Sequence, residues 1–154
     1  MSNNEFTPPT IMPISRVQQI LKITKEDELI TELGKFEDAI YSAGAPLIKL
    51  LSQDVRQSEV SNLLDHLTSV EKWRDRVCRW HSLARCFEEH TKSDHFTIRR
   101  TDGCKITEFD RLSYQKKLSA GFIGLEVYLE QMIRSIDSRT NLCKKLAGLD
   151  ETAF

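Results

Sequence analysis

The stretch from Val60 to Phe87 reads VSNLLDHLTSVEKWRDRVCRWHSLARCF, and it decides the fold class. Its apolar residues recur in steps of three and four, which is the spacing of one face of an α-helix. No glycine or proline interrupts it, and the positions between carry many charged side chains. We therefore predict one long helix whose narrow apolar stripe suits a bundle or a coiled-coil seam. That stripe consists of Val60, Leu63, Leu67, Val70, Trp73, Val77, Trp80, Ala84 and Phe87.

Two further stripes with the same spacing lie on either side of this stretch. The upstream stripe contains the run Gly44-Ala45-Pro46, and an interior proline removes a helical hydrogen bond and clashes with the preceding turn. We therefore expect a kink or a break there. The upstream stripe is Leu29, Leu33, Phe36, Ile40, Ala43, Leu47 and Leu50, and the downstream one is Leu118, Phe122, Leu125, Leu129, Met132 and Ile136.

Three striped segments and a short helix beginning near Pro13 predict an all-α fold, a three- to four-helix antiparallel bundle with coiled-coil-like packing. We expect residues 1–12 to be a flexible N-terminal segment, residues 13–147 to form a single helical domain, and residues 148–154 to be a frayed tail. Gly148 after two lysines is a typical helix stop. Alternating residues around Asp102-Gly103 indicate a small β-hairpin at residues 95–106.

Composition narrows the class of protein further. The chain has 154 residues, a formal net charge of -1 and four widely spread cysteines, which is typical of one domain with reduced thiols. The sequence contains no apolar run long enough to span a membrane and no signal-like start, so we expect an intracellular protein, nuclear or cytoplasmic, that does not contact membranes. The small net charge gives no general attraction to nucleic acid, which is therefore a partner that we do not favour.

Trp73, Trp80 and the arginines of the same helix are the candidate partner-binding residues. The two tryptophans are seven residues apart and share one face; we favour a place in the core over a groove for a partner helix. Arg74, Arg76 and Arg79 are interleaved with acidic residues, so a salt-bridged solvated face is a better interpretation than a phosphate-binding one.

Catalytic and metal sites have weaker support. We find no phosphate loop, no nucleophile elbow and no zinc-protease motif, and we predict neither an enzyme nor a cofactor. The cysteines and histidines between residues 78 and 104 have ligand types that zinc uses, but on one helix Cys78 and His81 point to a different side from Cys86 and His90. A zinc site completed by His95 or Cys104 stays an alternative.

Two resemblances point to chromatin. Residues 40–77 resemble the spectrin-like helical region of ARID-containing JmjC histone demethylases. Because the iron site and zinc fingers of those enzymes are absent from the sequence, this resemblance implies a scaffold without demethylase activity. Residues 13–22 are similar to the first helix of histone-fold subunits, in which the residue corresponding to Arg16 contacts DNA phosphate. Gly34, Gly44 and Pro46 depart from the long central helix of that fold.

These observations favour a non-enzymatic interaction or scaffold module that acts through helical surfaces in a chromatin-associated complex. Its expected partner is another helical protein or a second copy of itself. A histone-fold-like subunit associated with nucleic acid through Arg16, and a zinc-binding protein, are the alternatives.

Overall fold

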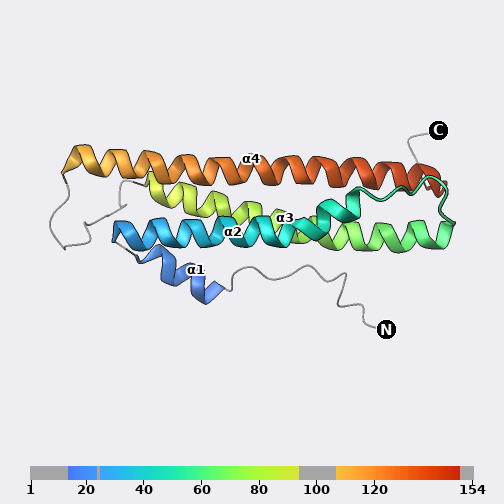
Figure 1. Ribbon diagram of the computed structural model, residues 1–154, viewed down its shortest axis with the longest axis horizontal. Helices are drawn as coiled ribbons and strands as arrows, with labels where there is room; N and C mark the ends of the chain where they lie inside the picture. Colours follow the sequence, from blue (N-terminus) through green and yellow to red (C-terminus); the bar gives the residue numbers. More distant parts are fainter. Residues whose placement is uncertain (1–13, 24, 94–106, 150–154) are drawn as a thin grey trace.

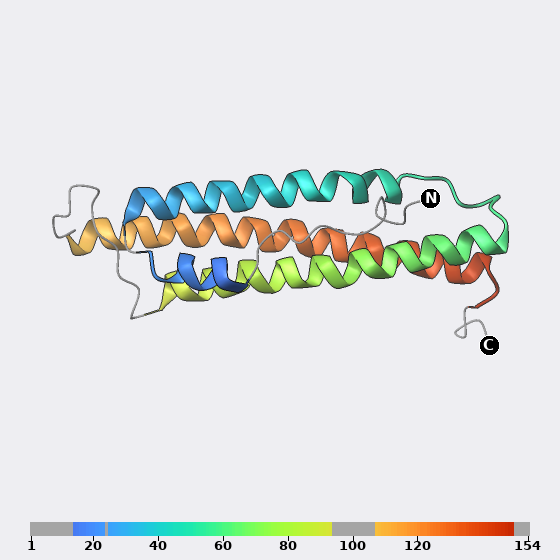
Figure 2. The same cartoon turned by 90° about the horizontal axis from the view of Figure 1, so that it is seen from below.

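The chain folds into four helices arranged as a bundle. The computed structural model describes residues 14–23, 25–93 and 107–149. The helices are α1 (Ile14–Leu21), α2 (Glu26–Leu51), α3 (Val60–Lys92) and α4 (Glu108–Leu146). Figure 1 shows the three long helices lying lengthwise together, with α3 running opposite to α2 and α4. Seen from below, α1 lies beside the end of the bundle where α2 begins (Figure 2). The predicted all-α bundle is confirmed.

The apolar stripes become the core because each faces the other helices. Val70, Val77 and Ala84 of α3 are fully buried, and so are Leu129 and Ile136 of α4. The backbones of α3 and α4 approach each other along much of their length, whereas α2 contacts α4 over a shorter zone. One continuous cluster of apolar side chains from all four helices fills the space between them.

Helix α2 runs without interruption from Glu26 to Leu51, with Pro46 inside it. Of the expected kink or break at Gly44-Ala45-Pro46, the break is therefore wrong, and the kink stays a prediction. Pro46 is exposed and lies close to the C-terminal end of the helix. The carbonyl of Ser42, which loses its amide donor, belongs to an exposed residue, so water can replace the missing hydrogen bond. Buried Leu47 and Leu50 beyond the proline keep the last turns of the helix on the core.

Both ends of α4 have local signals that fix them. At its start the side chain of Thr107 accepts a hydrogen bond from the backbone amide of Asp110. At its end Gly148 has φ +75°, and the amide of Leu149 donates to the carbonyl of Lys144 at 2.7 Å. This is the reversal for which glycine is favoured after a helix, and the predicted helix stop at Gly148 is confirmed.

Two further expectations concern a β-hairpin and a membrane-spanning segment. The predicted hairpin at residues 95–106 lies outside the described part of the chain, and the described residues contain no strand. Among the helices described, none is long and apolar enough to cross a membrane.

Candidate interaction surface

Trp73 and Trp80 lie inside the bundle. Their exposed fractions are 4% and 1%, and their rings contact each other edge to face with centroids 6.1 Å apart. Among the described residues, the indole nitrogen of Trp80 has no hydrogen-bond partner. Neither ring reaches the surface, and the pair forms part of the core that the stripe predicts.

The candidate arginines of α3 interact within the chain. Arg74 donates through Nε to Oδ1 of Asp137 on α4 at 2.7 Å, and this bond raises the pKa of its guanidinium. Arg79 forms an ion pair with Asp75 one turn earlier, at 3.3 Å. Arg76 is half-buried and also has a partner within the chain. Arg74 and Arg79 therefore belong to salt-bridged helix surfaces, and the pair of Arg74 joins α3 to α4.

Arg16, the candidate nucleic-acid contact, lies on α1. Its guanidinium bonds to the side chain of Gln19 and forms an ion pair with Glu32 of α2. That pair joins the short helix to the bundle. A phosphate would have to compete with a carboxylate already in place.

The cysteines and histidines do not converge in the described residues. Cys86 is exposed, Cys78 is half-buried, and His81 bonds through Nε2 to Glu130 of α4 at 3.1 Å. Burial lowers the pKa of His90. Residues 14–23, 25–93 and 107–149 contain no group of three or more metal-ligating side chains. His95 and Cys104, the proposed completing ligands, lie outside the described residues.

Helix α4 has two flanks of different character. On the flank toward α3, its acidic residues meet that helix: Asp137 bonds to Arg74 and Glu130 to His81. Glu126 shares a hydrogen bond with Glu88, and burial together with this neighbour raises the pKa of Glu126. These acidic residues of α4 thus lie where they contact α3.

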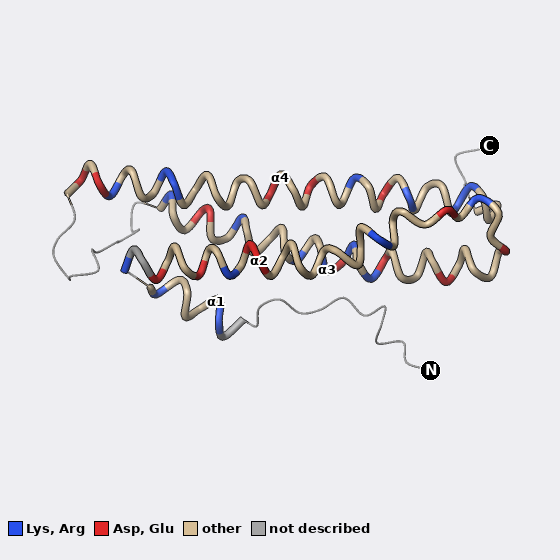
Figure 3. Tube along the Cα trace, viewed as in Figure 1, with Lys and Arg blue, Asp and Glu red and all other residues tan. Residues whose placement is uncertain are grey.

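On the opposite flank of α4, with Arg134 beside it, a row of uncharged residues extends over about 27 Å, from the helical rise per residue. Its residues follow one another in steps of three and four, so they share one side of the helix. All are exposed: Ala120, Gly124, Val127, Gln131, Ser135 and Ser138. A solvated helix face normally carries charged residues. Figure 3 shows acidic and basic residues interspersed along all the long helices.

A matching row lies on the neighbouring side of α2. Its members are uncharged and mostly apolar, with Glu37 and Asp38 in the turn between the second and the third: Ile30, Gly34, Tyr41, Ala45 and Ile48. Ile48 is 53% exposed, and Tyr41 is 48% exposed. Tyr41 packs edge to face on Tyr128 of α4, with ring centroids 4.7 Å apart, so the two rows lie side by side. We call the two rows together the α2–α4 face.

Two glycines let α2 and α4 approach each other beneath this face. A Cβ on Gly44 would lie 2.9 Å from Cε of Met132 and 3.2 Å from the hydroxyl of Tyr128. A Cβ on Gly121 would lie 2.9 Å from Cδ2 of Leu33. These contacts explain why two residues of low helix propensity occur inside long helices. Gly44 and Gly121 therefore lie where α2 contacts α4, and the small residues of the two rows lie beside this contact.

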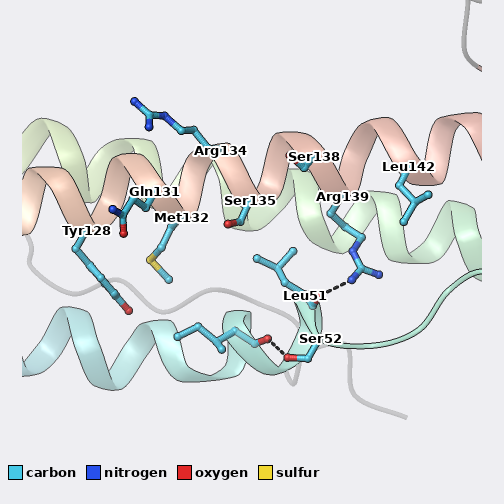
Figure 4. Close-up of a pocket in the computed structure, with 11 residues that line it drawn as sticks. Leu51, Ser52, Tyr128, Gln131, Met132, Arg134, Ser135, Ser138, Arg139 and Leu142 are labelled. Carbon is cyan, nitrogen blue, oxygen red and sulfur yellow. Dashed lines mark hydrogen bonds between the residues drawn. The ribbon is translucent and has the colours of Figure 1, made fainter.

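A groove of about 650 Å³ opens along the C-terminal half of the face. Figure 4 shows Tyr128 directed toward α2, Arg134 directed away from it, and Arg139 reaching across the junction. Arg139 donates to the backbone carbonyls of Leu51 and Gln53, which are free at the end of α2. Arg139, which joins the two helices here, is therefore already hydrogen-bonded within the chain, and the groove beside it stays open.

The lining of the groove determines what it can bind. Among the described residues that line it, none is a histidine, a cysteine or a carboxylate. It offers apolar surface, small side chains and serine hydroxyls. Sequence reasoning missed this face because it looked for charged and aromatic clusters. The signal was the heptad row of uncharged residues from Ala120 to Ser138.

The comparisons with known proteins do not assign the chain to a family. No protein-family model, no curated protein and no solved structure matches the chain.

Proposed function

We propose that the chain is a non-enzymatic interaction module that binds a helix of another chain on its α2–α4 face. The observation that carries the proposal is the uncharged row on α4, which continues for about 27 Å beside the apolar row of α2. Amphipathic helices bind in such grooves through apolar residues spaced three and four apart.

The composition of the two rows supports a helix as the ligand. In the part of the chain that the structure describes, no atom lies within 4 Å of the position that a Cβ on Gly34 or Gly124 would take, so packing among these residues does not require glycine at either place. A glycine in a helix interior costs about 1 kcal/mol relative to alanine. A second helix that approaches closely would give these small residues a role, and exposed Ile48 and Val127 would then be covered.

The cellular setting follows only from the resemblances. A scaffold role in a chromatin-associated complex, in the nucleus or cytoplasm, is part of the proposal on that ground. Nucleic-acid binding through Arg16 has less support, since its guanidinium is paired with Glu32.

Photo-cross-linking in cells tests the proposed face. A photoreactive amino acid is placed at Ile48 in one variant and at Val60 in a matched control, because these side chains are 53% and 54% exposed but Val60 lies at the start of α3. The proposal expects a discrete protein adduct from position 48 and none from position 60. Equal adducts from both positions, or none from position 48, would contradict it.

A further inference from the structure

We propose that the groove beneath α1 is a helix-binding site that α1 itself occupies, and that α1 detaches so that an amphipathic helix of the same chemistry from another chain binds in its place. That chemistry is a basic residue followed by apolar residues one, four and five positions later. In α1 these residues are Arg16, Val17, Ile20 and Leu21. The site is separate from the α2–α4 face, because none of its lining residues belongs to either row, so this inference does not rest on the proposed function.

The groove lies at the end of the bundle where α2 begins, and α1 lies against it (Figure 2). The three long helices supply its apolar walls. These walls contain Leu29, Leu33 and Phe36 of α2, Phe87 of α3, and Leu118 and Phe122 of α4. Ile20 of α1 faces the same space, in which a cavity of about 20 Å³ remains. Side chains that border empty space lose packing contacts there, so α1 does not fill the groove completely.

Few side chains hold α1 in the groove. Ile20 is 6% exposed, and Val17 and Leu21 are half-buried against the core. Arg16 forms an ion pair with Glu32, whose side chain is 13% exposed. Among the described residues that line the groove, Glu32 is the only carboxylate, so it favours a ligand with a basic residue at this place.

The ion pair between Arg16 and Glu32 can open without leaving the carboxylate alone. Nζ of Lys35 lies 3.8 Å from the same oxygen of Glu32, one turn further along α2. When Arg16 leaves, Glu32 therefore keeps a cation nearby, and water can reach it. The electrostatic cost of detaching α1 is small for this reason.

Helix α1 depends on the groove for its own structure. It has eight residues, whereas isolated helices shorter than about 12–15 residues are marginal in water. Its first turn contains no acidic residue and its last turn no basic residue, so neither end offsets the helix dipole. We therefore expect α1 to unfold as it detaches, in a local opening that leaves the three long helices packed.

Opening exposes the apolar walls of the groove to water, and this surface favours a replacement helix. Helix α1 is linked to the groove through residues 22–25, which gives it an effective concentration of millimolar order. An incoming helix binds only the open fraction of the chain, so its apparent affinity falls by that fraction. In this way α1 inhibits its own binding site.

An NMR titration of the isotope-labelled full chain with a synthetic peptide tests the site. The peptide is residues 14–23, ISRVQQILKI, with both ends blocked. Against the wild-type chain it should not reach saturation at about 1 mM, because α1 competes. Ile20→Asp in the full chain removes the buried contact of α1, so the peptide should bind at least tenfold more tightly and shift the amide signals of Leu33, Phe87 and Leu118. Val60→Asp, at an exposed position at the start of α3, should behave like the wild type.

Arg16→Glu in the full chain opens the site by a second route that leaves Ile20 unchanged. It replaces an attraction to Glu32 with a repulsion, so the peptide, which keeps Arg16, should bind about threefold to tenfold more tightly than to the wild type. A peptide with Ile20→Asp should bind none of these chains. Each variant is compared only if it keeps the helical circular dichroism spectrum of the wild type.

The possible results distinguish the two parts of the inference. Equal affinity of the peptide for the wild type and for both variants would overturn the claim that α1 covers the site. Absence of binding to both variants, or shifts confined to residues outside the groove, would overturn the site itself. Neither result bears on the α2–α4 face, whose test is the cross-link from position 48.

Discussion

Four glycines inside the long helices divide into two pairs with opposite expected responses to alanine. Gly124 is exposed on α4, and nothing lies within 4 Å of the position its Cβ would take. Gly124→Ala therefore gains helix propensity without a steric conflict, which is worth about 0.5–1 kcal/mol in the free energy of unfolding. For a chain of this size, 1 kcal/mol corresponds to a rise in Tm of about 3 °C. Gly34→Ala is expected to behave in the same way.

Gly44→Ala gains the same propensity but meets the junction of α2 and α4. Its Cβ would lie 2.9 Å from Cε of Met132, a flexible end, and 3.2 Å from the hydroxyl of Tyr128. The Tyr128 ring packs against Tyr41 and has little freedom to move away. Overpacking of this kind costs about 1–3 kcal/mol, so we expect a net loss of about 1 kcal/mol.

Urea and thermal unfolding followed by circular dichroism measure both effects. The protein should be dilute enough to be a single chain, because association would add its own stability to each variant. The reasoning predicts that the four variants separate into stabilised Gly34→Ala and Gly124→Ala and destabilised Gly44→Ala and Gly121→Ala. Stabilisation by Gly44→Ala equal to that by Gly124→Ala would refute the close approach of the two helices.

Three further substitutions test other contacts. Arg139→Met removes the two bonds to the carbonyls of Leu51 and Gln53 and should lower the free energy of unfolding by about 1–2 kcal/mol, with Arg134→Met, on the rim of the same groove, as the control. Gly148→Ala forces a side chain into the left-handed conformation at φ +75° and should cost about 1 kcal/mol in urea unfolding. Folding raises the pKa of Glu126, so the folded chain holds this proton more tightly than the unfolded chain, and stability falls as the pH rises through and above the ordinary carboxyl range. Glu126→Gln should therefore stabilise the chain by a few tenths to about 1 kcal/mol near pH 7 and have little effect near pH 3, where the carboxyl is protonated in both states; equal effects at both pH values would contradict the shift.

Much of the fold could be predicted from the sequence, because long helices with regular stripes have few other ways to bury them. The stripe through Trp73 and Trp80 is the core of α3, and the stripe from Leu118 to Ile136 is that of α4. The continuity of α2 could not be predicted in the same way. A proline removes one hydrogen bond wherever it occurs, but only the structure shows that the freed carbonyl lies at the surface and that Leu47 and Leu50 anchor the turns beyond it.

The candidate surface was harder to predict, because it is defined by the absence of charge. The residues from Ala120 to Ser138 share a helical spacing that the sequence already contains. Their meaning depends on which flank of α4 faces α3, and that became visible only when Asp137 and Glu130 were seen bonded to Arg74 and His81. Conspicuous residues such as Trp80 drew attention to the core instead.

Hydroxyl-radical footprinting is the most direct test of the claim that the α2–α4 face binds another chain. Oxidation of Tyr41, Ile48 and Val127 is compared between the dilute single chain and the assembled state, with exposed Val60 and Phe109 as references outside the face. The account predicts that oxidation of the three face residues falls severalfold on assembly while the references stay unchanged. Protection confined to other surfaces, with Ile48 and Val127 as reactive as before, would contradict it.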